Sequence, residues 1–427
     1  MSESFDAVII GAGPAGSTAA ILLARAGWSV ALVEKQAFPR RKVCGECIAA
    51  SNLPLLQLLG IAPMFDALAG APLRRVALLR GDDWALADLP PAPGPAAQRW
   101  GRPMAREQLD SLLLAQAQGA GAQLWQPWAV QTVTGSPGQW RCQLRSSHPD
   151  QQTTLLASVL IAAHGSWETL PGERDAQRPT HAASDLLAFK ANFRGGSLPE
   201  GLLPVLALDG GYGGMVVAEP GIITLACCVR RDRLDRLRQA RPKERAGEVV
   251  ETWLVQQCSG LQHSLQGARR DGPWLAAGPI APGIRLRADD AMLRIGNAAG
   301  EAHPILGEGI SMALQSAALL CSHLLDSPAR AGVPDRDRQA SIARAYAGQW
   351  RARFAPRLHL AALMAHLAMR RAPAGMLLGL AQAWPGLLTQ GARWGGKTRC
   401  AVDLSGFAAG RAPAQTLGQK PQRQAAG

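Results

Sequence analysis

The N-terminal pattern of apolar positions predicts a strand, a helix and a second strand in close succession. A short apolar run, Phe5 to Ile10, leads into the glycine-rich turn GAGPAG, and residues 17–26 then show apolar positions at helical spacing. A second apolar run, Ser29 to Val33, ends at Glu34. This order is typical of a βαβ unit with a tight glycine turn between its first strand and its helix.

The rest of the chain changes its pattern twice. Ser158 to Ala163 is continuously apolar, as expected of a strand that is buried on both faces. Four strand-like runs between residues 186 and 229 are separated by Gly and Pro and predict an inserted antiparallel sheet. Helical spacing returns from Gly309 to Leu325 and again over a long region from Asp335 to Arg371.

These elements predict an α/β protein with a Rossmann-like nucleotide-binding domain. We expect that domain to comprise residues 1–175 and 286–335, an inserted sheet domain for the substrate to comprise 176–285, a helical region to comprise 336–405, and a disordered tail to comprise 406–427.

The positive charge of the chain is concentrated near its C-terminus. The net charge is +13, and the segment from Arg338 to Gly427 holds thirteen Arg and Lys against one acid, Asp403. Long Ala, Leu and Met runs separate these basic residues, which argues against nucleic acid as the partner. An acidic partner, either a carrier protein or an anionic membrane surface, fits better, and an arginine-rich solvated helix face is the alternative.

Cysteine usage and the N-terminal sequence favour a cytoplasmic protein. The eight scattered cysteines do not resemble a disulfide framework, and the first residues lack the basic region and long apolar run of a signal peptide. We therefore expect a cytoplasmic location, with peripheral attachment to the inner membrane as the alternative.

The glycine turn and Glu34 predict a dinucleotide site. Gly11 makes the tight turn, Gly13 allows the pyrophosphate to approach, and Gly16 packs the helix on the strand. The helix N-terminus then faces the phosphates. Glu34 ends the second strand, where an acidic side chain accepts hydrogen bonds from ribose hydroxyls.

A second glycine-rich stretch, residues 295–316, predicts a flavin site. Its glycines allow close approach of a ligand, and the helix that begins near Gly309 offers free N–H groups to the electron-rich edge of a reduced flavin. His303 and Glu308 are the titratable groups nearest to that edge in the sequence and are our candidates for catalytic proton transfer. A structural role for Glu308 at the helix entry is an equal alternative.

With these motifs in place, the chain resembles the flavoprotein superfamily of FAD-dependent monooxygenases, whose fold is like that of para-hydroxybenzoate hydroxylase. Within it, the chain is most similar to the branch of geranylgeranyl reductases and FixC-type proteins. The resemblance rests on GAGPAG with Glu34, on FPRRKVCGE at residues 38–46, on the AxHGS segment at 162–166, and on GNAAGEAHPILGEGI.

The resemblance implies FAD as the cofactor and NADPH or NADH as a transiently bound reductant. The residues that it places at FAD are Gly11, Gly13, Ala15, Gly16, Glu34, Lys35, Arg41, Cys44, Arg106, Gly165, Gly296, Asn297, Pro304, Gly307, Gly309 and Ile310. It places Tyr212 and Met215 at the substrate.

The chain departs from the family at two positions. Relatives carry aspartate where this chain has His164 and Asn297, and the second position is expected to bond the ribityl hydroxyls of FAD. Because an asparagine carbonyl still accepts, binding should be weakened and Asn297→Asp should tighten it. His164 is either a cofactor or proton-transfer group or a histidine held at a strand end.

The CxxC pair, Cys44 and Cys47, has two interpretations. Alone it suggests a redox dithiol or half a metal site, but no second CxxC completes a zinc set, and we expect no metal. In the resembling family this loop lies beside the flavin, which is the simpler interpretation.

The leading functional hypothesis is an FAD-dependent monooxygenase that hydroxylates or epoxidises a hydrophobic, aromatic or polyketide-like small molecule. The alternative is flavin-dependent reduction of an isoprenoid or lipid double bond. A non-enzymatic escort protein would lack flavin. Halogenation ranks low because we find no paired-tryptophan motif and no matching lysine, and we interpret Lys190 as a solvated strand-edge lysine.

Overall fold

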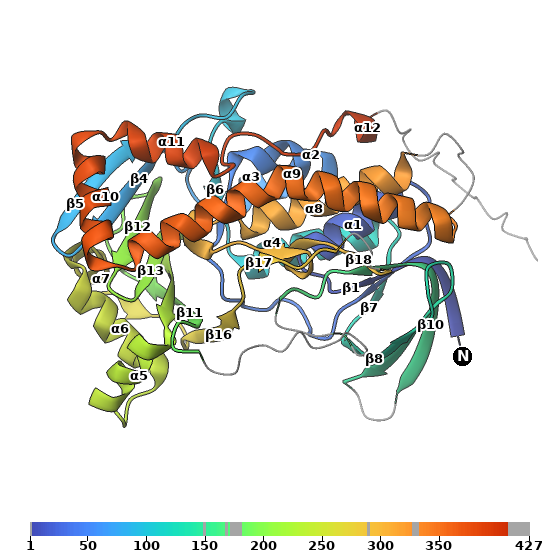
Figure 1. The fold of residues 1–427 in the computed structure, drawn as a ribbon, viewed down its shortest axis with the longest axis horizontal. Helices are drawn as coiled ribbons and strands as arrows, with labels where there is room; N and C mark the ends of the chain where they lie inside the picture. Colours follow the sequence, from blue (N-terminus) through green and yellow to red (C-terminus); the bar gives the residue numbers. More distant parts are fainter. Residues whose placement is uncertain are drawn as a thin grey trace, which may run out of the picture.

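The computed structural model describes residues 2–147, 151–166, 170, 182–287, 291–326 and 333–408. Two large sheets lie toward opposite ends of the molecule, and the long helix α9 (Arg336–Ala368) runs across both of them (Figure 1). The α/β class predicted from the sequence is confirmed. The predicted boundary at residue 175 and nearly all of the predicted tail lie outside the described residues, except for α12 (Ser405–Ala408).

The first sheet contains the predicted βαβ unit. Its order is β7 (Gln123–Trp125), β2 (Val30–Val33), β1 (Ser2–Ile10), β10 (Gln152–Ala162), β9 (Trp140–Ser146) and β8 (Trp128–Thr134), and β18 (Leu293–Arg294) pairs with β10. Strands β7, β2, β1, β10 and β18 run parallel to one another. Strand β9 pairs antiparallel with β10, and β8 pairs antiparallel with β9. The carboxyl ends of β1, β2 and β10 therefore meet at one edge, which is where ligands bind in open parallel sheets.

Helices cover this sheet and supply most of the core. They are α1 (Pro14–Arg25), α4 (Arg106–Gly119) and α8 (Gly309–Leu325), with α9 packed on α8, and α2 (Leu53–Leu59) and α3 (Ala62–Leu68) lie on the same side. The bounds of α8 agree with those predicted from the helical spacing. Its apolar residues are buried all round, as expected of a helix between two layers.

The second sheet has eight strands. Its order is β15 (Arg269–Arg270), β11 (Leu186–Arg194), β14 (Ile222–Arg230), β13 (Gly211–Glu219), β12 (Leu202–Leu208), β4 (Arg75–Arg80) and β5 (Asp83–Asp88), and β16 (Leu275–Ile280) pairs with β11. One face packs on α5 (Arg231–Ala240), α6 (Ala246–Gln257) and α7 (Ser259–Leu265), and the other packs on α9 and α10 (Arg371–Ala383).

The second sheet corrects the predicted domain division. The hairpin of β4 and β5 falls inside the predicted segment 1–175 but pairs with β12 of the second sheet. Because the β4–β12 pairing is parallel, the sheet is mixed and not purely antiparallel as expected. A connection that crosses between domains cannot be inferred from a local pattern of apolar residues.

Short elements join the two sheets around the candidate site. They are β3 (Cys47–Ile48) with β6 (Arg102–Pro103), β17 (Gly283–Ile284) with β19 (Gly300–Glu301), and the turns Ala50–Asn52, Gly296–Ala298 and Pro304–Leu306. A further turn, Ala96–Gln98, lies between β5 and β6 in the chain. Helix α11 (Gly386–Trp394) follows α10 beside β5 (Figure 1).

Candidate functional site

Two of the three N-terminal glycines are required by the fold. Gly11 has φ of +104°, and a Cβ there would lie 2.6 Å from the carbonyl oxygen of Ala163 at the end of β10. A Cβ on Gly16 would lie 1.8 Å from the carbonyl oxygen of Gly11. Packing of α1 against β1 and β10 therefore leaves no room for a side chain at either position.

Gly13 has no such structural reason to be glycine. Its φ of −68° and ψ of −176° suit any residue, and no heavy atom lies within 4 Å of a Cβ built there. It is the N-cap of α1, so the open space lies at a helix N-terminus, where free N–H groups favour an anion. A bound phosphate is the group that would need this space.

Glu34 is held in a fixed position beside the glycine turn. Its carboxylate accepts hydrogen bonds from the backbone N–H groups of Ala12 and Gln36, each at 3.0 Å, and pairs with Arg40 at 3.3 Å. The side chain is buried, whereas the next residue, Lys35, is exposed. An acidic group in this position suits the ribose hydroxyls of a dinucleotide.

A cluster of cations lies next to this region. Arg106, the first residue of α4, forms two 2.8 Å hydrogen bonds with Asp110 and is buried. Burial, with Arg106 and Arg40 nearby, lowers the pKa of Lys42 to about 8. Crowded cations of this kind fit an anionic ligand such as a pyrophosphate. Arg106 was expected from the sequence, whereas Lys42 was not, although the motif FPRRKVCGE contains it.

The fold brings the four sequence motifs together. A Cβ on Gly296, whose φ is +59°, would lie 2.9 Å from the Cβ of Ala15, so the second glycine-rich stretch meets the start of α1. A Cβ on Gly307 would lie 3.9 Å from the Cβ of Cys47. Gly165, after β10, has φ of +93° and open space around it. The other predicted cofactor residues of this loop lie at the last turn and at the start of α8: Pro304, Gly309 and Ile310.

The Asn297 side chain is engaged by a group that the sequence analysis missed. Its Nδ2 donates to Oε1 of buried Glu301 at 3.1 Å, and the same oxygen accepts from Ser166 at 3.0 Å. Arg285 binds the other carboxylate oxygen of Glu301 at 3.2 Å. Glu301 thereby connects the segment after β10 with the second glycine-rich stretch, and an aspartate at position 297 would face the Glu301 carboxylate.

Asn297→Asp should therefore destabilise the protein rather than tighten FAD binding. The change replaces a part-buried hydrogen bond with two facing carboxylates, and we expect a loss of about 1–3 kcal/mol in the free energy of unfolding. Thermal and urea unfolding of the apoprotein, with FAD titration of the same samples, measures both effects. Asn297→Ala is the control without charge, and tighter FAD binding by Asn297→Asp would contradict the assignment of Glu301 as the partner.

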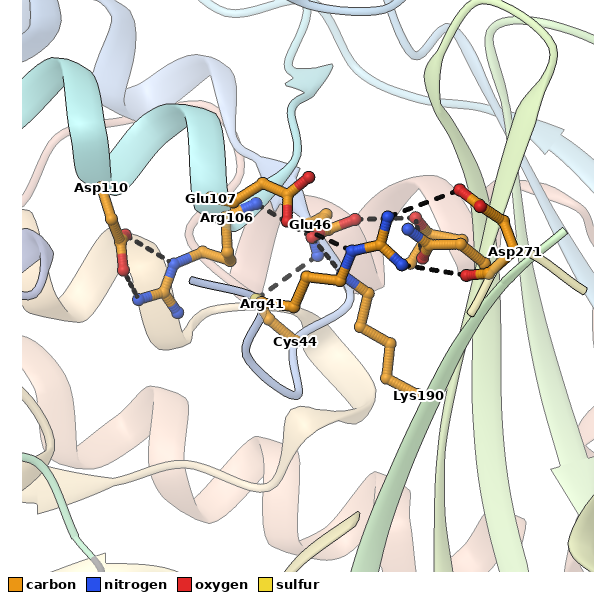
Figure 2. Close-up of polar contacts among 10 residues, drawn as sticks. Arg41, Cys44, Glu46, Arg106, Glu107, Asp110, Lys190 and Asp271 are labelled. Carbon is orange, nitrogen blue, oxygen red and sulfur yellow. Dashed lines mark hydrogen bonds and ion pairs between the residues drawn. The ribbon is translucent and has the colours of Figure 1, made fainter. Parts of the chain in front are cut away.

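Glu46 is the central residue of a second buried network, also missed from the sequence. It is a non-glycine residue with φ of +57°, and its carboxylate accepts from the backbone N–H of Arg106 at 2.9 Å and from Thr224 at 2.7 Å. Lys190 donates to the same carboxylate (Figure 2). Glu46 thus connects the start of α4 with β11 and β14 of the second sheet.

The interpretation of Lys190 as a solvated strand-edge residue is wrong. Its side chain is 3% exposed and forms an ion pair with Glu46. Strand residues alternate between faces, so Lys190 points away from Phe189 and Ala191, which pack beneath the outer helices. Lys190 is the one charged residue in the apolar run LLAFKANF. This pattern could have predicted a buried acidic partner, because a charge in a core strand needs a partner.

His303 and Tyr212 lie next to each other. The sequence placed His303 in catalysis and Tyr212 at the substrate, and did not predict this contact. The Tyr212 hydroxyl is 3.4 Å from Nδ1 of His303, and the rings of His303 and His366 are 5.8 Å apart. Burial and the nearby His366 lower the pKa of His303 to about 4, while burial and Cys228 raise the pKa of Tyr212. At neutral pH a neutral imidazole therefore faces a protonated phenol.

Met215 lies on the opposite face of β13 from Tyr212. It packs with Trp253 and Leu254 of α6, in the cluster beneath the outer helices. The two residues are three positions apart, and an odd separation in a strand places side chains on opposite faces. The structure therefore does not bring Met215 to the surface that carries Tyr212.

Glu308 belongs to a different network from His303. It is buried and pairs with Arg357 of α9 at 3.4 Å and with Lys397 at 3.2 Å, and Lys397 also donates to the carbonyl oxygen of Gly307 at 3.2 Å. Two cations thus hold Glu308, and this arrangement supports the structural alternative. The ion pairs hold the segment after α11 against residues 303–308, which precede α8 and which we call the flavin loop.

Arg41 and Cys44 lie where the two sheets meet. Arg41 pairs with Glu107 at 3.3 Å and with Asp271 at 3.4 Å, so its guanidinium bridges α4 and the loop before β16 (Figure 2). The Cys44 sulfur accepts from the backbone N–H of Glu46 at 3.4 Å. Cys44 and Cys47 are both free thiols, and burial raises the pKa of Cys47. Within the described ranges, no cluster of three or more His, Cys, Asp or Glu could hold a metal.

The assembled residues fit FAD. The N-terminus of α1 with Gly13 and the nearby cations suit the pyrophosphate, Glu34 suits the adenosine ribose, and the start of α8 suits the flavin. A family model described as "FAD binding domain" matches residues 4–332, well over half of the chain. The chain belongs to this FAD-binding family. It is an FAD-dependent oxidoreductase, so the expectations of an enzyme and of FAD as its cofactor are confirmed.

The chain is similar to two curated proteins whose names differ in function. The chain is 26% identical over 369 residues to Conditioned medium factor receptor 1 of Dictyostelium discoideum, covering 82% of this chain and 68% of the relative. It is 33% identical over 171 residues to Menaquinone reductase of Mycolicibacterium smegmatis, covering 40% of each chain.

Solved structures share the fold at low identity. The myxobacterial chondrochloren halogenase matches with a TM-score of 0.71 and 18% identity, covering 91% of each chain. A geranylgeranyl bacteriochlorophyll reductase-like protein of Thermoplasma acidophilum matches with a TM-score of 0.62 and 17% identity, covering 92% of this chain and all of that one (100%). Both halogenase and reductase structures share this fold, so neither branch of the family is singled out.

Proposed function

We propose that this flavoprotein is a monooxygenase that hydroxylates a hydrophobic aromatic or polyketide-like compound, with NADPH or NADH as reductant. The balanced reaction consumes the substrate, dioxygen, one NAD(P)H and one proton, and yields the hydroxylated product, NAD(P)+ and water. Bound FAD supplies the electrons that activate dioxygen. The chain itself must orient the substrate, exclude water and move protons.

The observation that carries this proposal is the chain of Tyr212, His303 and His366. Tyr212 is 1% exposed on β13, His303 is buried just before the turn Pro304–Leu306, and His366 is exposed on α9. The three groups thus connect the face of the sheet beside the flavin loop with solvent. A phenolic substrate is more reactive toward oxygenation once its proton has left, and this arrangement offers a path for that proton.

The protonation states define the resting site. Burial keeps His303 neutral and Tyr212 protonated near pH 7, so a separated imidazolium–phenolate pair is unfavourable. The transfer must therefore be concerted, with Tyr212 taking the proton of a substrate hydroxyl as it gives its own proton to His303. The imidazole then passes the proton to His366, which water can reach. Hydride addition to a double bond also consumes a proton, so the proton path alone does not separate the two reactions, and turnover with and without oxygen does.

Replacing Tyr212 with phenylalanine should lower kcat about 100-fold, the usual scale of a positioned proton-transfer group. KM should change little, and oxygen uptake should exceed product formation because oxygen activation continues without hydroxylation. The measurement compares NAD(P)H oxidation, oxygen uptake and product for alkylphenol substrates.

The matched control is Tyr346→Phe. Tyr346 is the other tyrosine of the chain, is equally buried, and donates to the carbonyl oxygen of Arg294 at 2.9 Å, away from His303. It should lose about 1 kcal/mol of stability and keep its kcat. Equal kcat losses in both variants would refute the proton path.

Turnover with and without oxygen tests the reaction type. Product formation coupled to oxygen uptake supports the monooxygenase, whereas anaerobic reduction of a menaquinone analogue by NADH or NADPH supports a reductase. The reductase is the second candidate because part of the chain is similar to Menaquinone reductase. A colourless protein that takes up no FAD would contradict both.

A further inference from the structure

Helix α10 is apolar on two opposite faces. Ala374, Leu378 and Ala381 are buried against the second sheet and α9. On the outer face, Met376 is 70% exposed and Leu380 is 58% exposed. A surface helix normally carries polar residues on its outer face. Exposed apolar residues on that face are typical of a contact surface for a partner or a membrane.

Two exposed tryptophans follow the outer face of α10 in the chain. Trp384 is 69% exposed in the turn after it, and Trp394 is 65% exposed at the end of α11. None of the α11 residues is fully buried. Both helices lie at the outer end of the second sheet, beside β5 (Figure 1). We call Met376, Leu380, Trp384 and Trp394 the exposed apolar surface.

Basic residues surround this surface. Arg370, Arg371, Arg393 and Arg399 are exposed in and next to the two helices. Arg371 pairs with Asp209 at 3.0 Å, which leaves Arg370, Arg393 and Arg399 to supply the positive charge. From residue 338 to 402 the chain has no acid. The neighbouring β4–β5 hairpin is balanced, with Arg74, Arg75 and Arg80 against Asp82, Asp83 and Asp88. The net charge around the exposed apolar surface is therefore positive.

We propose that the exposed apolar surface binds an anionic lipid bilayer, with α10 and α11 lying in its interface. Tryptophan rings favour the headgroup level, Met376 and Leu380 would enter the acyl boundary, and the arginines would contact lipid phosphates. No helix of the described chain is long and apolar enough to span a membrane. The contact is thus one of attachment to the surface.

This surface is connected to the flavin loop. Lys397, three residues after Trp394, binds Glu308 and Gly307. It also lines a small apolar cavity with Cys47, Trp100 and Leu203. Docking of Trp394 would place this side of the site at the bilayer, where a lipid-soluble compound is concentrated. Membrane binding itself does not depend on the reaction proposed above.

Cosedimentation of the purified holoprotein with vesicles tests the proposal without any turnover. Vesicles of phosphatidylcholine with phosphatidylglycerol should bind the protein, pure phosphatidylcholine should bind it far less, and high salt should release it. Equal recovery in the supernatant with both vesicles would overturn the proposal.

Two variants identify the surface. Arg370→Glu with Arg393→Glu should weaken binding to anionic vesicles about tenfold or more, and Trp384→Ser with Trp394→Ser should weaken it similarly. Arg236→Glu with Arg238→Glu, on exposed positions of α5, is the matched control for charge and should retain binding.

Two other partners of the exposed apolar surface, a second copy of the chain or an acidic carrier protein, would give different results in binding experiments. If the holoprotein dimerises with increasing concentration and the tryptophan variant is monomeric, the surface joins two copies of the chain. If an acidic carrier protein binds the holoprotein and vesicles do not, the partner is protein. Either result would overturn the lipid assignment.

Discussion

Lys190→Met should lower the free energy of unfolding by about 3–5 kcal/mol, because it leaves the Glu46 carboxylate buried without its cation. Thr224 and the Arg106 N–H remain as hydrogen-bond donors but carry no opposing charge. The expected loss is a large fraction of the stability of an ordinary domain. Urea unfolding of the apoprotein, followed by tryptophan fluorescence, measures it.

A double variant distinguishes the ion pair from simple loss of packing. Lys190→Met combined with Glu46→Gln removes both charges and should recover at least half of the lost stability. Lys243→Met, at an exposed position, is the control and should stay within about 0.5 kcal/mol of the wild type. A single variant as stable as this control would show that Lys190 does not pair with a buried acid.

Gly13→Val should weaken FAD binding roughly 100-fold while leaving the apoprotein folded. The position has ordinary backbone angles and no neighbour within 4 Å, so a side chain costs the apoprotein little. The valine would occupy the space that a pyrophosphate needs, and forcing atoms into a filled contact costs about 1–3 kcal/mol. FAD titration followed by flavin fluorescence measures the affinity, and thermal unfolding measures the stability.

Gly16→Ala is the matched comparison from the same turn. Its Cβ would meet the Gly11 carbonyl oxygen at 1.8 Å, so this smaller change should destabilise the apoprotein even without FAD. The two glycines thus separate a ligand requirement from a packing requirement. Unchanged FAD affinity in Gly13→Val would mean that the pyrophosphate does not lie at the start of α1.

Local motifs were enough to predict the cofactor and much of the architecture. The glycine turn, Glu34 and the second glycine-rich stretch are short motifs. In each of them a few neighbouring residues determine both the backbone geometry and the contact with the ligand. The helix Gly309–Leu325 and four of the eight strands of the second sheet, β11 to β14, followed from apolar spacing alone. The family match confirms the FAD assignment.

Contacts between distant segments were beyond the sequence. Glu46 meets Lys190 across 144 positions, and Ser166 meets Glu301 across 135. The residues next to each of these side chains in the sequence do not indicate its partner. The sequence interpretation therefore placed Lys190 in solvent and missed Glu301 as the partner of the Asn297 amide. The same holds for the β4–β5 hairpin, whose pairing with β12 depends on where the chain returns in space.

The sequence by itself determined that this chain is an FAD-binding α/β protein, because glycine turns and apolar periodicity act over short ranges that the order of residues fixes directly. The tertiary structure alone decided which charges neutralise one another, that Tyr212 meets His303, and that α10 turns a second apolar face outward. Burial and electrostatics depend on the neighbours in space, and those neighbours exist only once the chain has folded.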